Sequence, residues 1–489
     1  MRNSLPGSYT VHLDRMTAIE EIDETDFLSQ AEIDHSKIPS ALLLSGGKLS
    51  SGGENRYSIA AYDPFLTLSG KGDLTRIQEA GESYEICENP LRVLDRLCES
   101  IRPRFGPSSL PFCGGAIGYF AYDLKNSIEN LPACACDDLD LPDLFLFWPR
   151  VIEVYDRKEK KLFRIVVRPD EEGWTQALSR SVPATPCPSD SRCRRGEIEE
   201  QKGHSLQNRF EIGPLQSNFT HDDYLAAVSK VREYIRRGDV YQVNLSQRFQ
   251  FPMKGTPFRL WKSLFNINPA PFYAYINARD HHILSTSMER FLFRKGRSIE
   301  TRPIKGTRRR GHTEQEDEAL VADLLSSPKD DAELSMIVDL MRNDLGRICS
   351  PGTVRVLEHK RLETYRNVHH LISIVTGALR PGTTPSEIIR AAFPGGSITG
   401  CPKIRSMEII DELEPNVRHV YTGAIGYIGW HDNLDLNVAI RTAVIKDETC
   451  YFSVGGGIVF DSVEEDEYQE TLHKGRTLFE LIERLRSKQ

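Results

Sequence analysis

Near the end of the chain, three ionisable side chains share one face of a predicted helix. Glu467, Glu470 and Lys474 follow one another at spacings of three and four residues, which places them on one side of a helix. Just upstream, the strand-like stretch SVGGGIVF carries three consecutive glycines that begin at Gly455. Glycine weakens a strand, and one reason for it is the close approach of a ligand to bare backbone N–H groups. A solvated Glu–Lys pair and a simple β-bulge are the alternative interpretations.

Other polar side chains with possible chemistry lie beside apolar stretches. Glu333 opens a predicted helix over 331–345, Glu289 follows an apolar strand, and His370 lies in an apolar context. Arg441 shares a face with alanines in the predicted strand LDLNVAIRTAVI, which leaves room for a planar carboxylate partner. Each is also compatible with a structural polar residue or salt bridge. The chain has no HExxH motif or EF-hand loop, whereas two glutamates with substrate oxygens and water would suit Mg²⁺.

One lysine is surrounded by arginines in the stretch TRPIKGTRRRG, residues 301–311. Lys305 ends a predicted strand there, and a phosphate or nucleic-acid patch, a solvated turn and a reactive amine are all possible. The net charge of −8 and the lack of interleaved aromatic residues argue against nucleic acid. An amine must be neutral to act as a nucleophile, and burial or nearby positive charge favours that form.

The elements that must position these residues are clearest in the second half of the chain. Residues 1–180 mix short strands with one helix, and 181–218 is a proline- and serine-rich linker or surface insertion. Residues 219–489 begin with a helix that Thr220 caps. The stretch VYQVNLSQRFQF then alternates apolar and polar residues, as a strand with one apolar face does.

The end of the chain is equally regular in its pattern. Residues 419–460 predict three antiparallel strands, with turns at WHDN and KDET, and a last helix runs from about residue 464 to 486. No apolar run reaches the roughly 20 residues of a membrane span, and no secretory signal is visible. The ten cysteines are scattered without a CxxC pair, so we expect free thiols and a cytoplasmic protein.

Taken together, the motifs occur in one order that resembles the chorismate-utilising family. They are PIKGT, ELSMIVDLMRNDLGR, NVHHLIS, PGGSITGCPKIRSMEIIDELEP, YTGAIGYIG, IRTAV, GGGIVFDS and EYQET, over about residues 219–485. The N-terminal part matches more loosely, through ALLLSGG and NRYSIAAYDP. The resemblance implies an α+β fold, a layered sandwich of two largely antiparallel β-sheets flanked by helices. Both parts of the chain would contribute strands, and chorismate would lie in a cleft of the C-terminal part.

The resemblance also implies a role for each candidate residue. Glu333 and Glu470 would hold Mg²⁺, with Glu467 as a supporting carboxylate, and the ion would bridge to the ring carboxylate of chorismate. Glu289 would help the C4 hydroxyl to leave. The implied substrate-binding residues are Ser397, Tyr421, Arg441, Gly455, Gly457 and Lys474, and the implied catalytic residues are Lys305, Glu289 and His370.

Lys305 distinguishes branches of the family. Anthranilate synthases look like PIAGT here, whereas members that place ammonia at C4, toward 4-aminobenzoate and folate, look like PIKGT. In the implied mechanism the lysine attacks C2 and expels the C4 hydroxyl; ammonia then attacks C4 and expels the lysine from C2, which is nucleophilic catalysis. Gln242 stands where members that use water carry a lysine base. Because the chain shows no glutaminase nucleophile of its own, a separate glutamine amidotransferase subunit is the implied partner.

Two alternatives remain. The chain could be the chorismate-binding component of an anthranilate synthase, or a catalytically inactive amino-acid-binding relative, since LLLSGG resembles the part that binds tryptophan in relatives. SMERF and TGCPK depart from the usual SPERF and TGAPK, although Glu289 and Lys403 are kept. Joint retention of six polar residues argues against an inactive protein: Glu289, Lys305, Glu333, His370, Arg441 and Glu470.

Overall fold

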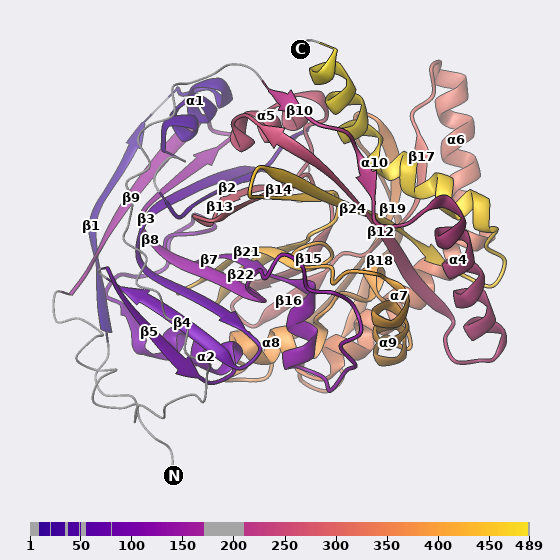
Figure 1. The fold of residues 1–489 in the computed structure, drawn as a ribbon. Coiled ribbons are helices and arrows are strands. Elements are labelled where there is room, and N and C mark those ends of the chain that lie inside the picture. The colour runs from indigo at the N-terminus through magenta and orange to yellow at the C-terminus, as the bar shows by residue number, and fades with distance from the viewer. Residues whose placement is uncertain are drawn as a thin grey trace, which may run out of the picture.

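Two largely antiparallel β-sheets flanked by helices make up the computed structural model (Figure 1), as expected from the sequence. The structure describes residues 9–19, 21–34, 38–47, 49, 55–79, 81–170 and 210–487. The predicted linker therefore lies outside the described residues up to residue 209. Within its described part, β10 (Glu211–Ile212) and β11 (Gln216–Ser217) pair with β12.

The first sheet, called sheet 1, carries Lys305 near one end. Neighbouring strands in it are antiparallel. Strand β19 pairs with β16 and β17 along one edge and with β18 along the other. Its order is β5 (Glu82–Cys87), β4 (Leu74–Glu79), β3 (Tyr57–Lys71), β8 (Leu144–Asp156), β7 (Gly115–Phe120), β21 (Ala424–Gly429), β22 (Asn433–Val438), β15 (Arg290–Lys295), β16 (Ser298–Thr301) with β17 (Ile304–Arg309), β19 (Val368–Ala378) and β18 (Arg355–Thr364).

The second sheet, called sheet 2, carries the glycine-rich strand β24. All its neighbours are antiparallel except the pair β1–β6. Its order is β6 (Ile101–Pro103), β1 (Tyr9–Ile19), β9 (Lys161–Pro169), β8, β3, β2 (Ser40–Leu44), β13 (Tyr273–Asn277), β14 (His281–Ser285), β23 (Thr442–Lys446), β24 (Thr449–Ile458) and β12 (Gln242–Lys254), with the short β20 (Gly400–Cys401) beside the start of β12.

The two long strands β3 and β8 belong to both sheets. The first half of β3 pairs with β2, and its second half pairs with β4, with a change of register between Pro64 and Leu66. Two further pairs, β2 with β13 and β7 with β21, join the predicted N-terminal region of the chain to its predicted C-terminal region. Both predicted regions therefore contribute strands to both sheets.

The helices lie outside the sheets (Figure 1). Several start as the sequence predicts: the side chain of Thr220 accepts a hydrogen bond from the backbone N–H of Asp223 at the start of α4. The helices are α1 (Glu24–Asp34), α2 (Pro90–Ser100), α4 (His221–Arg236), α5 (Pro257–Ile267), α6 (Glu314–Ser326), α7 (Pro328–Gly346), α8 (Pro385–Ala392), α9 (Lys403–Leu413) and α10 (Glu464–Arg486), with 3₁₀ turns η1 (Tyr122–Ser127) and η2 (Gly396–Ile398).

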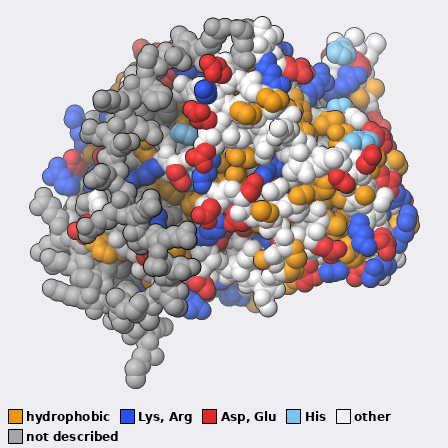
Figure 2. Space-filling view, in the orientation of Figure 1, with side chains coloured by type: hydrophobic (Ala, Val, Ile, Leu, Met, Phe, Trp, Pro, Cys, Tyr) orange, Lys and Arg blue, Asp and Glu red, His pale blue; other side chains and the backbone are white. Residues whose placement is uncertain are grey.

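Two apolar clusters hold the layers together. The larger one includes the fully buried Trp148 and Tyr119, and the smaller one packs Trp261 of α5 against sheet 2. The eight cysteines within the described ranges are free thiols. In the same ranges, no helix is both long and apolar enough to cross a membrane. Figure 2 shows acidic and basic side chains intermixed on one face, without a broad basic field.

One expectation about the strands is wrong, and one face of β12 is buried further than its pattern requires. The polar residues Gln242, Asn244 and Ser246 of β12 are all buried. The stretch 419–460 forms four strands, not three, because the predicted central strand breaks between β22 and β23. Arg441 has a left-handed backbone at this break, with φ of 50°, so it does not lie on a regular strand face.

Candidate active site

Two chain crossings between the sheets bring Glu289 and Arg441 together. After β14 the chain leaves sheet 2 for β15 of sheet 1, and after β22 it returns from sheet 1 to β23 of sheet 2. The crossings run side by side: Thr286 N donates to Arg441 O at 3.0 Å, and Val438 N donates to Glu289 O at 3.0 Å. The strand break thus places both residues where the sheets meet.

Glu289 is a buried acid held by a hydroxyl group. Its side chain accepts a 2.7 Å hydrogen bond from Ser397 Oγ, which η2 presents. Burial raises the pKa of Glu289 from its usual 4.5 to about 7, although the Ser397 hydrogen bond and the charge of Lys305 oppose the shift. Glu289 is therefore poised to carry and release a proton near neutral pH.

Lys305 extends from β17 toward the glycines of β24. Its Nζ lies 3.9 Å from Glu333 Oε2 of α7 and 3.4 Å from the point where a Cβ on Gly457 would lie. The amide of Gln242 is closer still to that point. Gln242 is fully buried, and neither its Oε1 nor its Nε2 has a hydrogen-bond partner in the described part of the chain. The amine and the unpaired amide thus both approach the same side of Gly457.

The arginines after Lys305 bind carboxylates of the neighbouring helices instead of facing the lysine. Each reaches α6 or the start of α7, so these helices are fixed over β17 by ion pairs. The pairs are Arg308 with Asp323 and Asp330, Arg309 with Glu316, and Arg310 with Asp317. The arginines are therefore structural partners of α6 and α7.

His370 is buried on β19, beside Lys305's strand. Its Nδ1 lies 2.9 Å from Thr307 Oγ1, and its Nε2 is buried with no partner within the described ranges. Burial, with the nearby charge of Arg441, lowers the pKa of His370 to about 3. The ring is therefore neutral, and one nitrogen is left to bind a ligand.

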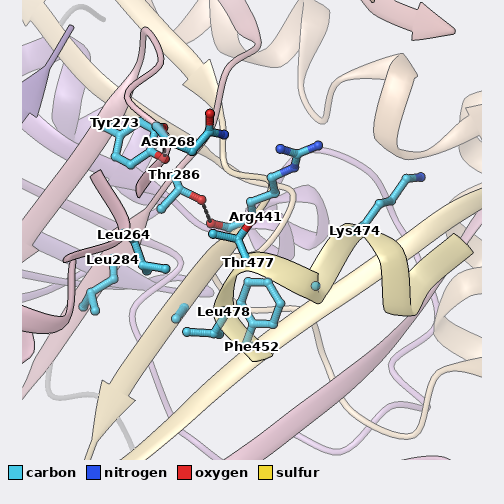
Figure 3. Close-up of a pocket in the computed structure, with 12 residues that line it drawn as sticks. Leu264, Asn268, Tyr273, Leu284, Thr286, Arg441, Phe452, Lys474, Thr477 and Leu478 are labelled. Carbon is cyan, nitrogen blue, oxygen red and sulfur yellow. Dashed lines mark hydrogen bonds between the residues drawn. The ribbon is translucent and has the colours of Figure 1, made fainter. Parts of the chain in front are cut away.

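Arg441 and Lys474 line one pocket from different elements (Figure 3). The guanidinium of Arg441 makes no hydrogen bond or ion pair with any residue that the structure describes, and burial lowers its pKa. An unpaired, planar guanidinium suits a carboxylate ligand. Lys474 Nζ donates to Gly455 O at 2.9 Å and lies 2.7 Å from Glu470 Oε1. The simple Glu–Lys pair considered from the sequence is therefore present, and Lys474 also touches β24.

The predicted metal residues lie on facing elements. Glu467 Oε2 and Glu470 Oε1 of α10 approach the position of a Cβ on Gly456 to 3.2 and 3.3 Å, whereas Glu333 of α7 lies beside Lys305. Burial, together with the charge of Glu470, raises the pKa of Glu467. No cluster of three or more metal-binding side chains occurs in the described ranges. However, Glu467 Oε2 is buried and unpaired there, and a divalent cation would fit that oxygen.

Two further predicted positions, Gly455 and Tyr421, are also buried. Gly455 packs tightly on β12, where a Cβ would approach Leu245 O to 2.6 Å. Burial raises the pKa of the Tyr421 hydroxyl group, and the side chain of Asn244 opposes this shift. Asn244 was not singled out from the sequence. Its alternation with Gln242 on the polar face of the predicted strand was the signal that could have found it.

A second cavity, of about 670 Å³, opens beside β2 and includes the LLLSGG stretch. Leu43, Leu44 and Ser45 line it together with Phe272 and Tyr273. Its position agrees with the part of the chain that resembles a tryptophan-binding region. Its occupant stays a prediction.

Comparison with known proteins identifies the class to which this fold and site belong. The sequence profile of the chorismate binding enzyme family matches residues 52–480. The chain therefore belongs to this family and is a chorismate-utilising enzyme.

Individual relatives fall into two groups. Aminodeoxychorismate synthase component 1 of Bacillus subtilis is 39% identical over 439 residues, 89% of this chain and 91% of that protein. Anthranilate synthase component 1 of Cereibacter sphaeroides is 38% identical over 439 residues, 88% of this chain and 87% of that protein. The crystal structure of anthranilate synthase component I from Streptococcus pneumoniae superposes with a TM-score of 0.71, at 33% identity over 86% of this chain and 91% of that one. Overall identity thus does not separate the two activities.

Proposed function

We propose that the protein is component 1 of an aminodeoxychorismate synthase, which converts chorismate and ammonia into 4-amino-4-deoxychorismate and water. The observation that carries this proposal is the position of the Lys305 amine, which lies 3.4 Å from the point where a Cβ on Gly457 would lie. The product would lead to 4-aminobenzoate and folate.

The reaction would proceed by two displacements through the ring's double bonds. Lys305 Nζ forms a bond to C2, the double bonds shift, and the C4–oxygen bond breaks. Glu289 supplies the proton with which the hydroxyl group leaves as water, which its raised pKa of about 7 favours. Ammonia then forms a bond to C4, the double bonds shift back, and the bond between C2 and Lys305 breaks.

Binding groups would come from several elements. Arg441 and Lys474 would take carboxylates of chorismate, while Tyr421, Ser397, His370 and the glycines of β24 would enclose the ring. We also propose that Glu333 and Glu470, with Glu467 beside them, hold Mg²⁺, which would neutralise the substrate's ring carboxylate. Removing Mg²⁺ with a chelator should weaken chorismate binding.

Ammonia would come from a glutamine amidotransferase subunit. The relatives' names call each of them component 1 of a synthase, which supports a protein that works with a second component. Free ammonium should serve as a weaker substitute for that subunit.

The test is product identification with chorismate, Mg²⁺ and ammonium. The wild type should form 4-amino-4-deoxychorismate, and Lys305→Ala should not. In the absence of ammonia, the wild-type chain should gain the mass of chorismate less one water. Arg308→Ala, a change on the same strand whose side chain faces α6 and α7, is the matched control and should keep the adduct.

Other products would decide against the proposal. Anthranilate from the wild type would favour an anthranilate synthase, whose relatives match nearly as well. An unchanged product from Lys305→Ala would remove the covalent role. No turnover even with an amidotransferase would favour the inactive amino-acid-binding relative.

A further inference from the structure

A buried ion pair outside the substrate-facing residues joins the segments that carry them. Glu414 follows α9, and Arg418 lies four residues further on; their side chains are 4% and 2% exposed. Arg418 Nη2 donates to Glu414 Oε1 at 2.6 Å, and Arg418 Nε donates to Glu414 Oε2 at 2.9 Å. The two-pronged geometry fixes both side chains.

The pair first holds β12. Arg418 Nη2 donates to Asn244 O at 2.5 Å, and Glu414 Oε1 accepts from both the backbone N–H and the hydroxyl group of Ser246, at 2.8 and 2.9 Å. The Asn244 side chain in turn acts on Tyr421, because it opposes the rise that burial causes in the pKa of the Tyr421 hydroxyl group. Gln242, whose amide faces Lys305, is two residues away on the same strand.

The pair also holds the turn that presents Ser397. Arg418 Nη1 donates to Ile398 O at 3.0 Å and to Thr422 Oγ1 at 3.3 Å. Ile398 is adjacent to Ser397, whose hydroxyl group binds Glu289. One guanidinium therefore contacts β12, η2 and the segment that follows Tyr421.

Stability alone is a weak reason for such a pair. Burying two charges costs several kcal/mol for each ion, and well-packed apolar residues often serve stability equally well. Here every further hydrogen bond of the pair goes to a segment that carries candidate active-site residues. This pattern indicates that the pair positions those segments relative to one another.

We propose that Arg418, held by Glu414, is a positioning residue that fixes Ser397, Tyr421 and the start of β12 relative to one another, and through Ser397 orients Glu289. This positioning role rests on the proposed function only in taking chorismate as the substrate. The role of Arg418 is the same whether the product is 4-amino-4-deoxychorismate or anthranilate. Formation of anthranilate would therefore overturn the proposed function and leave the positioning role standing.

The test uses the full chain with chorismate, Mg²⁺ and ammonium. Arg418→Lys keeps the charge and cannot reproduce the fork of contacts. Since a shift of about 1 Å can cost on the order of 100-fold in rate, kcat should fall at least about tenfold, with a smaller change in KM. Arg248→Lys is the matched control: it also weakens a two-pronged pair on β12, with Asp138, away from η2.

The pH profile separates positioning from folding. The Ser397 hydrogen bond lowers the pKa of Glu289, and the charges acting on that acid, Lys305 from β17 and Lys474 from α10, stay in place in the variant. If Arg418→Lys displaces Ser397, this hydrogen bond weakens and the pKa of Glu289 rises. The alkaline limb of kcat should therefore move to higher pH, in the same direction as in Ser397→Ala. Arg248→Lys should leave the limb unchanged.

A second variant covers the case in which Arg418→Lys does not fold. The double variant Arg418→Met/Glu414→Gln removes both buried charges and keeps a hydrogen-bond acceptor for Ser246. A folded variant with reduced kcat and a shifted limb supports the proposal. A folded variant with a wild-type profile, or a loss no greater than that of Arg248→Lys, would overturn it.

Discussion

At the scale of single residues, Glu289 makes the clearest pH prediction. If its protonated form gives the proton to the leaving hydroxyl group, the fraction of enzyme that carries this proton should fall as the pH rises through the raised pKa of about 7, which gives kcat an alkaline limb. Glu289→Gln should reduce kcat by a factor on the order of 10² to 10⁴ and remove this limb. The measurement is kcat between about pH 6 and 9 at a constant concentration of free NH₃, because ammonium itself titrates in this range.

Thermal stability provides the control for the same residue. A carboxyl whose pKa is raised from 4.5 to about 7 on folding stabilises the fold below its unfolded pKa, and that contribution is lost as the pH rises through about 7. Glu289→Gln cannot ionise, so above pH 7 it should be more stable than the wild type, by up to about 3 kcal/mol. A variant that lost both activity and stability at pH 8 would contradict this account, since misfolding would then explain the activity.

At the scale of elements, the three glycines of β24 have different roles. A Cβ on Gly455 would collide with the backbone of β12, at 2.6 Å from Leu245 O, whereas one on Gly457 would meet only the ends of the Gln242 and Lys305 side chains. Gly455→Ala should therefore destabilise the protein by about 1–3 kcal/mol. Gly457→Ala should change the melting temperature little and lower kcat/KM, because its methyl group would displace the ends of the Gln242 and Lys305 side chains.

Thermal unfolding and steady-state kinetics on both variants check this contrast. Each variant is the matched control for the other, since both add one methyl group to the same strand. Equal losses of stability would show that the glycines are required only for sheet packing.

The elements also show what the sequence could and could not predict. Helices α4, α7 and α10 were predicted near their observed positions because their apolar stripes and caps are local signals. The break before Arg441 was missed because apolar alternation continues through it, and only the pairing of β22 and β23 with different sheets requires it. The burial of Gln242 and Asn244 could not be predicted from the strand pattern, because a polar strand face has the same alternation whether it borders water or the protein interior.

The arginines of TRRRG illustrate the same limit for charge. Their clustering on β17 suggested either an anion patch or an influence on Lys305. In the fold each one reaches a carboxylate on α6 or α7. The partners are 7 to 22 residues away in the chain, so the periodicity of β17 alone could not reveal them.

At the scale of the whole molecule, the sheets tie the two halves of the chain together. Strand β21 depends on β7, and β13 depends on β2. Without the N-terminal half, both strands would present unpaired edges, and exposed edges promote aggregation. The regions 1–180 and 219–489 predicted from the sequence would then be segments of one folding unit.

A fragment experiment tests this dependence. Residues 210–489 expressed alone should aggregate or fail to bind chorismate, although they include every predicted catalytic residue. Co-expression with residues 1–180 should restore turnover, because β2 and β7 can supply the missing pairs from a separate chain. A full chain cleaved at a protease site inserted between the halves is the control for the cut itself, and it should keep its activity. A soluble 210–489 fragment that turns over chorismate would mean that the shared sheets are dispensable and that the catalytic part folds by itself.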